Sequence, residues 1–531
     1  MNTPLLRRAR VVVSLIFLFS TTLLFLDFLG FIPSSISNGI LFFQFVPSAL
    51  KFVAVISLGT FGFALVLLLT ILFGRVYCST ICPLGIMQDV VNWISKKIDK
   101  KKRRRFEYLR EQKILRFTIL VVPVLFFLAG SAFAVNLLDP YSIYGRIAGN
   151  LFRPVIIFAN NVAASVFEKM RVYTFSTYDI KAFVLFPFLI TAAFLLLVVY
   201  MSWKKGRLYC NTVCPVGTLL GYLSKFSIFK IVINDEDCLS CGICAKECKS
   251  CCIDSKNKAI DTSRCVMCFD CLTSCPTDGI TLSRSYTKKY FNKRTQEQSE
   301  SVPLDISKRN FITGTVLYLL SLSTIAGQVS KNIKVTKLSK IPISRKSAAS
   351  PPGSKSVERF NSKCTACHLC VGACPTQVLQ PSFLEYGFLG MLQPRMDNNA
   401  GFCNFECKIC GDVCPTGAIL PMSLEYKKLT QIGKAKFIED NCIVKTQETD
   451  CGACSEHCPT KAVHMIPYKK NLFIPEVREE YCVGCGACEF ACPVKPYKAI
   501  YVEGNPIHQL AKKNVEQKKE EQVNTKEDFP F

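Results

Sequence analysis

The stretch CTACHLCVGACP, residues 364–375, opens a segment in which sixteen cysteines fall into four sets of four. The sets are Cys364/Cys367/Cys370/Cys374, Cys403/Cys407/Cys410/Cys414, Cys442/Cys451/Cys454/Cys458 and Cys482/Cys485/Cys488/Cys492. The first and last sets have the spacing C-x2-C-x2-C-x3-C-P, in which three close thiolates hold one iron–sulfur cube and the fourth binds a neighbouring cube. The segment therefore predicts four [4Fe-4S] clusters in a protein that collects electrons and passes them on.

A disulfide framework and zinc ribbons are the alternative interpretations of so many cysteines. Zinc ribbons usually combine two well-separated C-x2-C pairs. Here every set instead ends in C-x2-C-x3-C followed by a proline, at Pro375, Pro415, Pro459 and Pro493. Four repetitions of this bacterial-ferredoxin spacing favour clusters over both alternatives.

The composition predicts a membrane protein. Half of the 531 residues are hydrophobic, and the mean hydropathy of +0.26 is unusual for a soluble chain of this length. The net charge of +25 lies largely beside apolar segments, so membrane topology explains it better than nucleic-acid binding, and no nucleic-acid partner is expected. The four histidines all lie beyond the apolar half, which excludes a haem held there by two histidines.

Four apolar segments are each long enough to cross a hydrocarbon core of roughly 30 Å as a helix. They lie at residues 11–30, 52–73, 117–138 and 182–203. The loop 74–116 contains twelve Lys and Arg residues, against only Lys51 in the loop 31–51, so the basic loop and the N-terminus are predicted to be cytoplasmic and to contact membrane lipid. A further apolar piece at 151–167 contains Arg153 and two asparagines, which favours an interfacial or re-entrant position over a span.

The apolar half contains an internal repeat. The sequence GRVYCSTICPLG at residues 74–85 follows the second segment, and GRLYCNTVCPVG at residues 206–217 follows the fourth. A duplicated helical hairpin would bring the cysteines of both copies to equivalent positions. These cysteines are Cys78, Cys82, Cys210 and Cys214. Two interpretations stay open: a four-thiolate iron or iron–sulfur site shared by the hairpins, and two structural or reversibly oxidised thiol pairs.

Two more cysteine sets follow the repeat, Cys238/Cys241/Cys244/Cys248 and Cys265/Cys268/Cys271/Cys275. Short strands are predicted at 230–233 and 279–282, so residues 230–285 are predicted to form a two-cluster ferredoxin domain. In that fold Cys238, Cys241, Cys244 and Cys275 hold one cube, and Cys265, Cys268, Cys271 and Cys248 hold the other. The prediction totals six [4Fe-4S] clusters, and Cys251 and Cys252 have no assigned role.

The segment 286–358 is predicted to be a linker that contains a signal-like transmembrane helix at 311–327. The residues before this helix, Ser307-Lys308-Arg309-Asn310-Phe311, are similar to a twin-arginine export signal with Lys308 in place of the first arginine. Export would place the four-cluster domain, residues 359–505, on the periplasmic side. In the alternative, 311–327 is a core or membrane-surface helix and this domain stays inside. The tail 506–531 is predicted to be disordered.

Residues 1–285 resemble the membrane quinol dehydrogenase subunit NapH and its relatives NosR and CcoG, through the apolar segments, the repeated G-R-x-Y-C-x-T-x-C-P-x-G and the two-cluster ferredoxin. Residues 307–500 resemble NapG, the exported four-cluster partner of NapH, so the chain is similar to a fusion of the two subunits. The resemblance implies a membrane α-helical bundle, with four transmembrane helices within residues 1–229, joined to α+β ferredoxin-like domains in a bacterial cytoplasmic membrane. It also implies quinol as the electron donor. We place the candidate quinol site around Tyr141 and Arg146, in the polar turn that follows the third apolar segment.

Two functions are consistent with these observations. In the first, the protein oxidises quinol and passes electrons to an extracytoplasmic reductase or c-type cytochrome. In the second, which the CcoG resemblance implies, it is an assembly factor that reduces a metal or thiols of another complex. The cysteines of the repeat would then be its working thiols. A protein that used clusters only to stabilise its fold would not require six of them, so a purely structural role is not expected.

Overall fold

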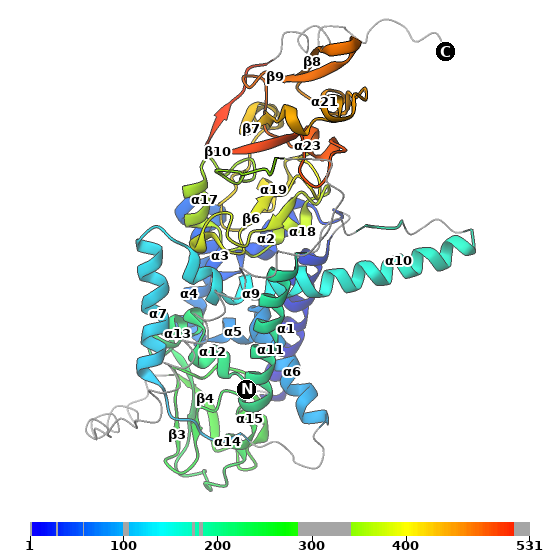
Figure 1. The fold of residues 1–531 in the computed structure, drawn as a ribbon. Coiled ribbons are helices and arrows are strands. Elements are labelled where there is room, and N and C mark those ends of the chain that lie inside the picture. The colour runs from blue at the N-terminus through cyan, green and yellow to red at the C-terminus, as the bar shows by residue number, and fades with distance from the viewer. Residues whose placement is uncertain are drawn as a thin grey trace, which may run out of the picture.

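The computed structural model describes residues 3–27, 30–56, 58–98, 106–171, 176–179, 184–284 and 341–513. The predicted helix at 311–327 and its signal-like flank lie outside these ranges. The chain forms a helical bundle within residues 3–224, a small domain (229–284) and a C-terminal domain (341–513). Figure 1 shows the small domain at one end of the bundle and the C-terminal domain at the other.

The bundle is built from apolar helices joined by short helical turns. Its longer helices are α1 (Thr3–Leu26), α4 (Gly62–Phe73), α6 (Pro83–Ile98), α7 (Lys113–Leu128), α10 (Arg153–Lys169) and α11 (Leu185–Lys205). Shorter elements connect them: α2 (Ser34–Phe42), α3 (Phe45–Ala54), α5 (Val76–Thr80), α8 (Phe133–Leu138), α9 (Pro140–Ile147), a π-helical turn (Ala148–Phe152), α12 (Leu208–Thr212) and α13 (Pro215–Ser224).

The spans differ from the prediction. Among the described residues, three helices are long and apolar enough to cross a membrane, Pro4–Leu26, Pro140–Lys169 and Leu185–Lys205, and there are four if α2 and α3, bent by 107°, count as one. The predicted segment 52–73 is broken, because α3 ends at Ala54 and α4 begins only at Gly62. The predicted segment 117–138 is also broken, because α7 ends in a turn where Gly130 adopts a φ of 84°. These two segments are therefore not single helices, and the predicted count of four is not confirmed.

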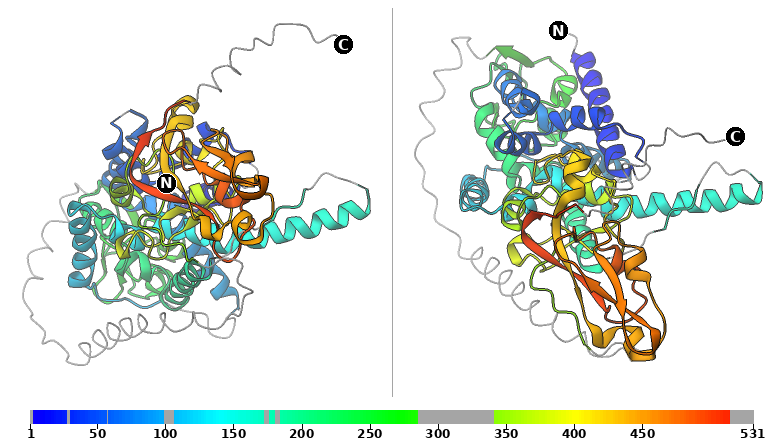
Figure 2. Two further views of the ribbon diagram at one scale, coloured as in Figure 1. Left: turned by 45° about the horizontal axis from the view of Figure 1, so that its top comes forward. Right: turned by 90° about the horizontal axis from the view of Figure 1, so that it is seen from above.

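Helix α10 continues from α9 and the π-helical turn but does not run beside the other long helices. In Figures 1 and 2 it extends away from the bundle, across the direction of α1 and α11. Its apolar side chains are exposed, with Phe158 at 70% and Val155 at 66%. This direction agrees with the interfacial or re-entrant position predicted for residues 151–167, whereas length and hydropathy alone would also allow a span.

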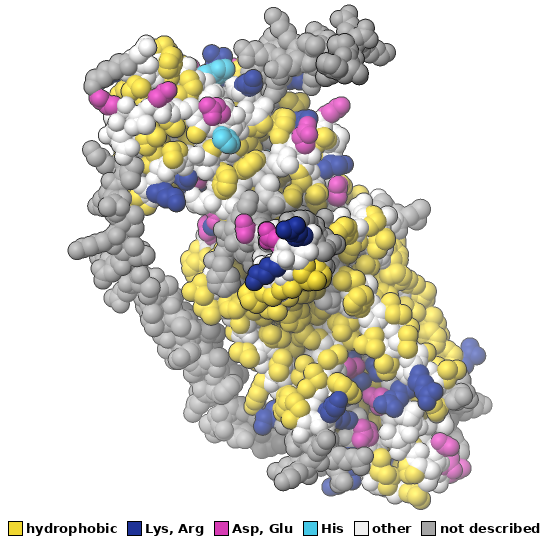
Figure 3. All heavy atoms as spheres, turned by 90° about the vertical axis from the view of Figure 1, so that its right-hand side faces the viewer, with side chains coloured by type: hydrophobic (Ala, Val, Ile, Leu, Met, Phe, Trp, Pro, Cys, Tyr) yellow, Lys and Arg dark blue, Asp and Glu magenta, His cyan; other side chains and the backbone are white. Residues whose placement is uncertain are grey.

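The surface of the bundle is apolar. On the face drawn in Figure 3, hydrophobic side chains form a broad belt between two ends that carry most of the charged side chains. Exposed apolar residues on α1, α7 and α11 extend this surface, for example Phe19, Leu125 and Leu196 at 66, 57 and 68% exposure. Apolar surface of this extent is typical of a protein that faces lipid, so the belt supports a membrane location.

The small domain pairs its first and last strands. β1 (Phe229–Ile233) and β4 (Ile280–Arg284) are antiparallel, with Ile231 opposite Leu282, which confirms the strands predicted there. Between them lie α14 (Ile243–Glu247), β2 (Ile253–Asp254), β3 (Ala259–Ile260) and α15 (Asp270–Ser274). The two ends of the domain are thus held together, and its cysteine motifs lie between them.

The C-terminal domain consists of short helices and two-stranded antiparallel sheets. The strand pairs are β5 (Leu379–Pro381) with β6 (Pro394–Met396), β7 (Thr430–Phe437) with β10 (Ile500–Leu510), and β8 (Val463–Pro467) with β9 (Phe473–Val477). The helices are α17 (Val357–Lys363), α18 (Leu369–Ala373), α19 (Ile409–Asp412), α20 (Leu424–Leu429), α21 (Ile443–Gln447), α22 (Ala453–Glu456) and α23 (Ala487–Ala491).

This domain is longer at both ends than the predicted 359–505. Residues 341–358, expected to belong to the linker, pack onto it because Glu503 accepts hydrogen bonds from the backbone N–H groups of Lys346 and Ser347, at 2.7 and 2.8 Å. At the other end β10 runs to Leu510, into the tail predicted to be disordered, because its last residues still pair with β7. Both predicted boundaries are therefore corrected outward.

Candidate iron–sulfur centres

The ligand candidates of the two domains come together in six groups of four cysteines. Group 1 is Cys238, Cys241, Cys244 and Cys275; group 2 is Cys248, Cys265, Cys268 and Cys271; group 3 is Cys364, Cys367, Cys370 and Cys414; group 4 is Cys374, Cys403, Cys407 and Cys410; group 5 is Cys442, Cys451, Cys454 and Cys492; group 6 is Cys458, Cys482, Cys485 and Cys488. In each group one thiol lies within electrostatic interaction range of the other three. Every group thus combines three cysteines of one motif with one cysteine of a neighbouring motif.

Three of these groups line pockets, and the lining of each pocket can be compared with what a cluster requires. Groups 2, 4 and 5 each line a pocket in which all four of their cysteines form part of the wall. Mostly apolar side chains form the rest of each wall, and all thirty cysteines of the chain are free thiols. A cubane cluster needs four thiolates around a central space. The residues present therefore fit this cofactor.

Four of the motifs turn the backbone in the same way between their second and third cysteines. The residue that follows the second cysteine, Gly242, Phe269, His368 or Gly486, has a φ between 63° and 81°. A short helix begins directly after each of these residues and carries the third cysteine. The left-handed residue thus reverses the chain, so that the third thiol returns toward the first two.

Burial makes these thiols weak acids. It raises the pKa of Cys268, Cys454 and Cys485 to about 12 each. Iron binds the thiolate, so binding has to displace these protons and depends on pH. Cys248 differs from the others, because contact with the Cys252 thiol lowers the pKa of Cys248 to about 7.

The six groups form two rows, one in each domain. Groups 1 and 2 are neighbours in the small domain, and the order in the C-terminal domain is 3, 4, 6, 5. Neighbouring groups are identified by thiols within electrostatic interaction range, Cys244 with Cys271, Cys414 with Cys410 and Cys488 with Cys454, and by the Cys403 N–H that donates to the Cys485 carbonyl at 2.8 Å. The spatial order differs from the sequence order, because the last motif packs between the second and third motifs of that domain.

The cysteines of the internal repeat, Cys78, Cys82, Cys210 and Cys214, also come together, and we call them the central group. Each of these thiols lies within electrostatic interaction range of the other three. All four are 3–4% exposed and belong to the apolar core of the bundle. Among the described residues, no set of three or more His, Cys, Asp or Glu side chains is arranged to hold a single metal ion.

The arginines of the repeat hold the two copies together. Arg75 donates from Nη2 to the carbonyl oxygen of Cys210 at 3.1 Å, and Arg207 donates from Nη1 to the carbonyl oxygen of Cys78. Each arginine therefore crosses to the first cysteine of the other copy. Both guanidinium groups are buried, at 0 and 1% exposure. Each guanidinium group therefore needs a hydrogen-bond acceptor from the other copy of the repeat.

The last glycine of each repeat allows this close packing. A Cβ atom on Gly85 would lie 2.4 Å from the carbonyl oxygen of Cys78, and one on Gly217 would lie 2.2 Å from that of Cys210. Any larger residue would push the helix that follows the second cysteine away from the first. The glycine therefore keeps the two cysteines of each copy together.

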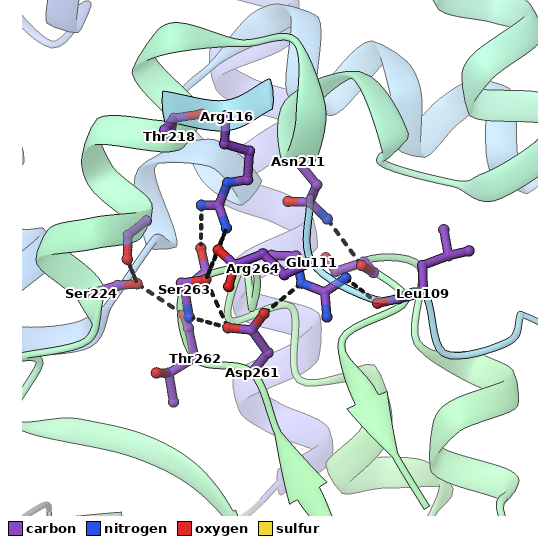
Figure 4. A network of polar contacts seen from close by, with 12 residues as sticks. Leu109, Glu111, Arg116, Asn211, Thr218, Ser224, Asp261, Thr262, Ser263 and Arg264 are labelled. Atoms are coloured by element: carbon purple, nitrogen blue, oxygen red, sulfur yellow. Dashed lines mark hydrogen bonds and ion pairs between the residues drawn. The ribbon is translucent and has the colours of Figure 1, made fainter. Parts of the chain in front are cut away.

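The small domain docks on the bundle through buried polar contacts. Figure 4 shows Arg116 of α7, whose Nη1 donates to Ser263 Oγ at 3.0 Å. Asn211 of the repeat donates to the carbonyl oxygen of Ser250 at 2.9 Å, and Ser224 donates to that of Thr262 at 2.9 Å. The loops around group 2 are thus fixed against the helices that carry the central group.

Asp89 of α6 is the charged hub of this interface. Its carboxylate contacts three cations: Arg10 at 3.3 Å, Arg207 at 2.7 Å and Lys249 at 2.9 Å. The side chains of these cations are only 1–7% exposed. One carboxylate therefore joins α1, the second repeat copy and the loop that follows Cys248.

Group 3 meets the opposite end of the bundle, where α1 ends. A Cβ on Gly145 of α9 would lie 2.5 Å from the carbonyl oxygen of Cys367 and 2.6 Å from the ring of Phe25. Tyr141 and Arg146, the candidate quinol site, are each 1% exposed, and Tyr141 belongs to the same apolar cluster as Phe25 and Cys367. The structure therefore does not place them on an open face, and their packing joins the bundle to group 3.

Comparison with known proteins finds iron–sulfur domains in both parts of the chain. A family model described as a 4Fe-4S binding domain matches residues 57–102 and 185–234, which contain the two repeat copies. A 4Fe-4S dicluster domain matches residues 449–495, and another 4Fe-4S binding domain matches residues 357–380.

Relatives among known proteins match about two fifths of the chain. The chain is 26% identical over 234 residues to the putative electron transport protein YccM of Escherichia coli (43% of this chain, 56% of YccM). It is 27% identical over 230 residues to the ferredoxin-type protein NapH of Escherichia coli (40% and 63%) and 24% identical over 206 residues to the regulatory protein NosR of Stutzerimonas stutzeri (38% and 23%). Its homologues are membrane polyferredoxin-type electron-transport proteins. The chain spans less than two thirds of each of these three relatives, and no solved structure matches it.

Sequence reasoning missed the polar residues that hold the bundle and the small domain together. The arginines of the repeat were visible in the motif, but Asp89, Arg116 and Lys249 carry no motif of their own. A signal was present for Asp89, because it is an acidic residue in the strongly basic loop 74–116. For Cys252 the signal was its position beside a cysteine motif that lacks the usual proline.

Proposed function

We propose that this polyferredoxin is a membrane electron-transfer protein in which groups 1 to 6 each hold one [4Fe-4S] cluster, six in all. The observation that carries the proposal is the pair of cysteine rows, which begin at the two ends of one helical bundle. Clusters that only stabilised the fold would not need to lie in two rows that begin at opposite ends of the bundle. When bound, such clusters supply one-electron transfer at potentials set by burial and hydrogen bonding.

The central group is proposed to hold a further iron–sulfur cluster that connects the rows. Arg7 contacts the small domain and Phe25 contacts group 3, and along α1 these residues are roughly 27 Å apart at 1.5 Å per residue. Electron tunnelling slows exponentially with distance, so transfer over this length without an intermediate would be slow. The central group belongs to the same apolar core as Cys268 of group 2 and Cys367 of group 3, which supports a relay between them.

Quinol is the proposed electron donor, and an extracytoplasmic reductase or c-type cytochrome the proposed acceptor, as the likeness to NapH implies. The predicted cytoplasmic residues lie at the small-domain end, because Arg7 contacts Asp270 and Lys96 contacts Glu247. By the positive-inside rule the C-terminal domain would then lie on the periplasmic side of a bacterial cytoplasmic membrane. Its row of clusters would lead electrons away from the membrane.

Anaerobic mixing with quinol tests the donor. Full-length protein purified in detergent is oxidised and then mixed with menaquinol or ubiquinol, while the cluster absorbance is followed. Bleaching by either quinol is the expected result, and the corresponding quinone is the control. If neither quinol bleaches the clusters, although dithionite does, quinol is not the donor.

A double variant of the central group tests the relay. The full chain with Cys82→Ser and Cys214→Ser is compared with Cys251→Ser, another buried cysteine outside the groups. In sealed liposomes, external dithionite should reduce both cluster rows in wild type and control, but only the row facing the reductant in the double variant. Equal reduction rates in all three proteins would contradict the relay, as would an unchanged iron and sulfide content.

The alternative function is an assembly factor whose repeat cysteines reduce a metal or thiols of another complex. Such thiols have to meet a partner, whereas the central thiols are 3–4% exposed and enclosed by the bundle. This burial favours the electron-transfer proposal. Rapid labelling of the central cysteines by a bulky thiol reagent in the native protein would instead favour the assembly role.

A further inference from the structure

Five cysteines, not four, line the cavity of group 2. Cys252 lies beside Cys248, Cys265, Cys268 and Cys271 in the wall of the same pocket. Its side chain is 1% exposed, and its Sγ lies 3.6 Å from the Sγ of Cys248. A cubane cluster uses four protein thiolates. The site therefore has one thiol more than the cluster requires.

The surplus thiol is held in place by the backbone. The carbonyl of Cys252 accepts a hydrogen bond from the N–H of Asp261 at 2.9 Å, and the strand β2 begins at the next residue. Cys251 behaves differently, because its Sγ contacts the carbonyl oxygen of Lys205 in the bundle at 3.7 Å. Of the two cysteines without an assigned role, Cys252 is the one in the wall of the cavity.

The motif around Cys248 is also unusual in sequence. In the other five motifs the fourth cysteine is followed by proline, whereas Cys248 is followed by Lys249. Lys249 is 6% exposed and pairs with Asp89 at 2.9 Å and with Asp270 at 3.2 Å. The position of Cys248 is therefore coupled to the docking of the small domain on the bundle. Cys252 follows this tethered segment and does not share its ion pairs.

We propose that Cys252 is a second protein ligand for the cluster position assigned to Cys248, so that either thiolate can complete group 2. The inference rests on the proposed function, because it requires a cluster at this site. In the exchange the Cys248 Sγ–iron bond breaks and a Cys252 Sγ–iron bond forms. The proton released by Cys252 moves to the neighbouring Cys248 Sγ, so no electron and no further reactant is consumed.

Single and double substitutions in the full-length chain test this inference. The variants are Cys248→Ala, Cys252→Ala, both together, and Cys251→Ala as the control. Each is purified anaerobically, and iron content is measured together with electron paramagnetic resonance spectra of the oxidised and dithionite-reduced protein. Both single variants and the control should keep the wild-type iron content, with small shifts in the reduced spectrum of Cys248→Ala. The double variant should lose iron and gain the oxidised-state signal of a [3Fe-4S] cluster.

The inference is overturned if Cys248→Ala alone shows the iron loss of the double variant, because Cys252 then does not replace it. It is also overturned if Cys252→Ala alone loses iron. If the double variant does not fold, the iron content of Cys248→Ala compared with that of wild type still decides whether Cys252 can replace Cys248. A wild-type protein without iron would instead refute the proposed function, so the two failures are distinguishable.

Discussion

Replacing Asp89 by asparagine should loosen the small domain from the bundle. The asparagine has nearly the same size, so the change removes the charge while leaving the packing intact. Three cations that are 1–7% exposed would lose their shared carboxylate, and Lys249 would keep only Asp270 at 3.2 Å. Removing one partner from a buried ion pair costs about 3–5 kcal/mol, because it leaves an uncompensated buried charge.

The matched control is Glu247→Gln, which also changes a carboxylate to an amide at the same interface. Glu247 pairs with Lys96 at 2.8 Å, but the two side chains are 45 and 33% exposed. An exposed pair contributes only about 0–1 kcal/mol. The two variants therefore separate the effect of buried charge from the effect of a lost ion pair.

Hydrogen exchange of the docked loops measures the difference. Local opening that becomes 3–5 kcal/mol easier accelerates exchange by roughly 10²- to 4 × 10³-fold, since 1.4 kcal/mol is a factor of ten. We expect this acceleration around residues 205–213 and 249–265 in the Asp89 variant and little change in the control. Equal exchange in the two variants would refute the assignment of Asp89 as the hub of the interface.

Three further perturbations have defined outcomes. Gly217→Ala places a Cβ 2.2 Å from the Cys210 carbonyl oxygen, so thermal stability should fall by about 1–3 kcal/mol, as is typical of overpacking. Gly39→Ala, inside α2 and with open space around it, should not lower stability, because alanine favours a helix over glycine by roughly 0.5–1 kcal/mol; equal melting temperatures of the two variants would contradict this. Burial lowers the pKa of His508 to about 4, so His508 takes up a proton at a higher pH in the unfolded chain than in the folded chain. The stability of the C-terminal domain should therefore decrease as pH falls from about 6.5 to about 4. His508→Gln should remove that component of the pH dependence, and an unchanged profile would count against it. Glu489→Gln should destabilise the same domain by about 1–3 kcal/mol in chemical denaturation, because this carboxylate is 0% exposed and loses its ion pair with Arg345, whereas the amide oxygen can still accept from the Val502 N–H; denaturation curves that coincide with wild type would show that the ion pair is dispensable.

The chemistry of the sites could be predicted from the sequence because cysteine spacing is a local property. Within one motif, a few residues and a left-handed turn decide where three thiols lie, and the residue types at Gly242 and Gly486 agree with that turn. The strands that close the small domain were predictable for the same reason. Local patterns of this kind do not depend on how the domains are arranged.

The arrangement of the groups could not be predicted, because it depends on contacts between distant residues. No pattern in the sequence places the backbone of Cys403 against that of Cys485, which makes the last motif a neighbour of the second. The break between α7 and α8 was likewise hidden, because Gly130 lies inside an apolar run that satisfies the length of a span. Tyr141 and Arg146 are buried among bundle residues such as Phe25, Asn136 and Phe194, which the sequence does not reveal, and their assignment as a quinol site stays a prediction.

The duplication explains why the central group lies between the two copies of the repeat. A single copy carries two cysteines and an arginine whose buried guanidinium has to find acceptors, and in this chain those acceptors include the first cysteine of the other copy. The two copies therefore assemble four thiols only when they pack together, and the same contacts exclude water from the site. The small domain then adds to this arrangement, because Arg75 also donates to the Ser263 carbonyl oxygen at 3.0 Å. A substitution that separates the repeat copies should thus disturb the central group and the docking of group 2 together, whereas a substitution in the row from group 4 to group 5 should leave both intact.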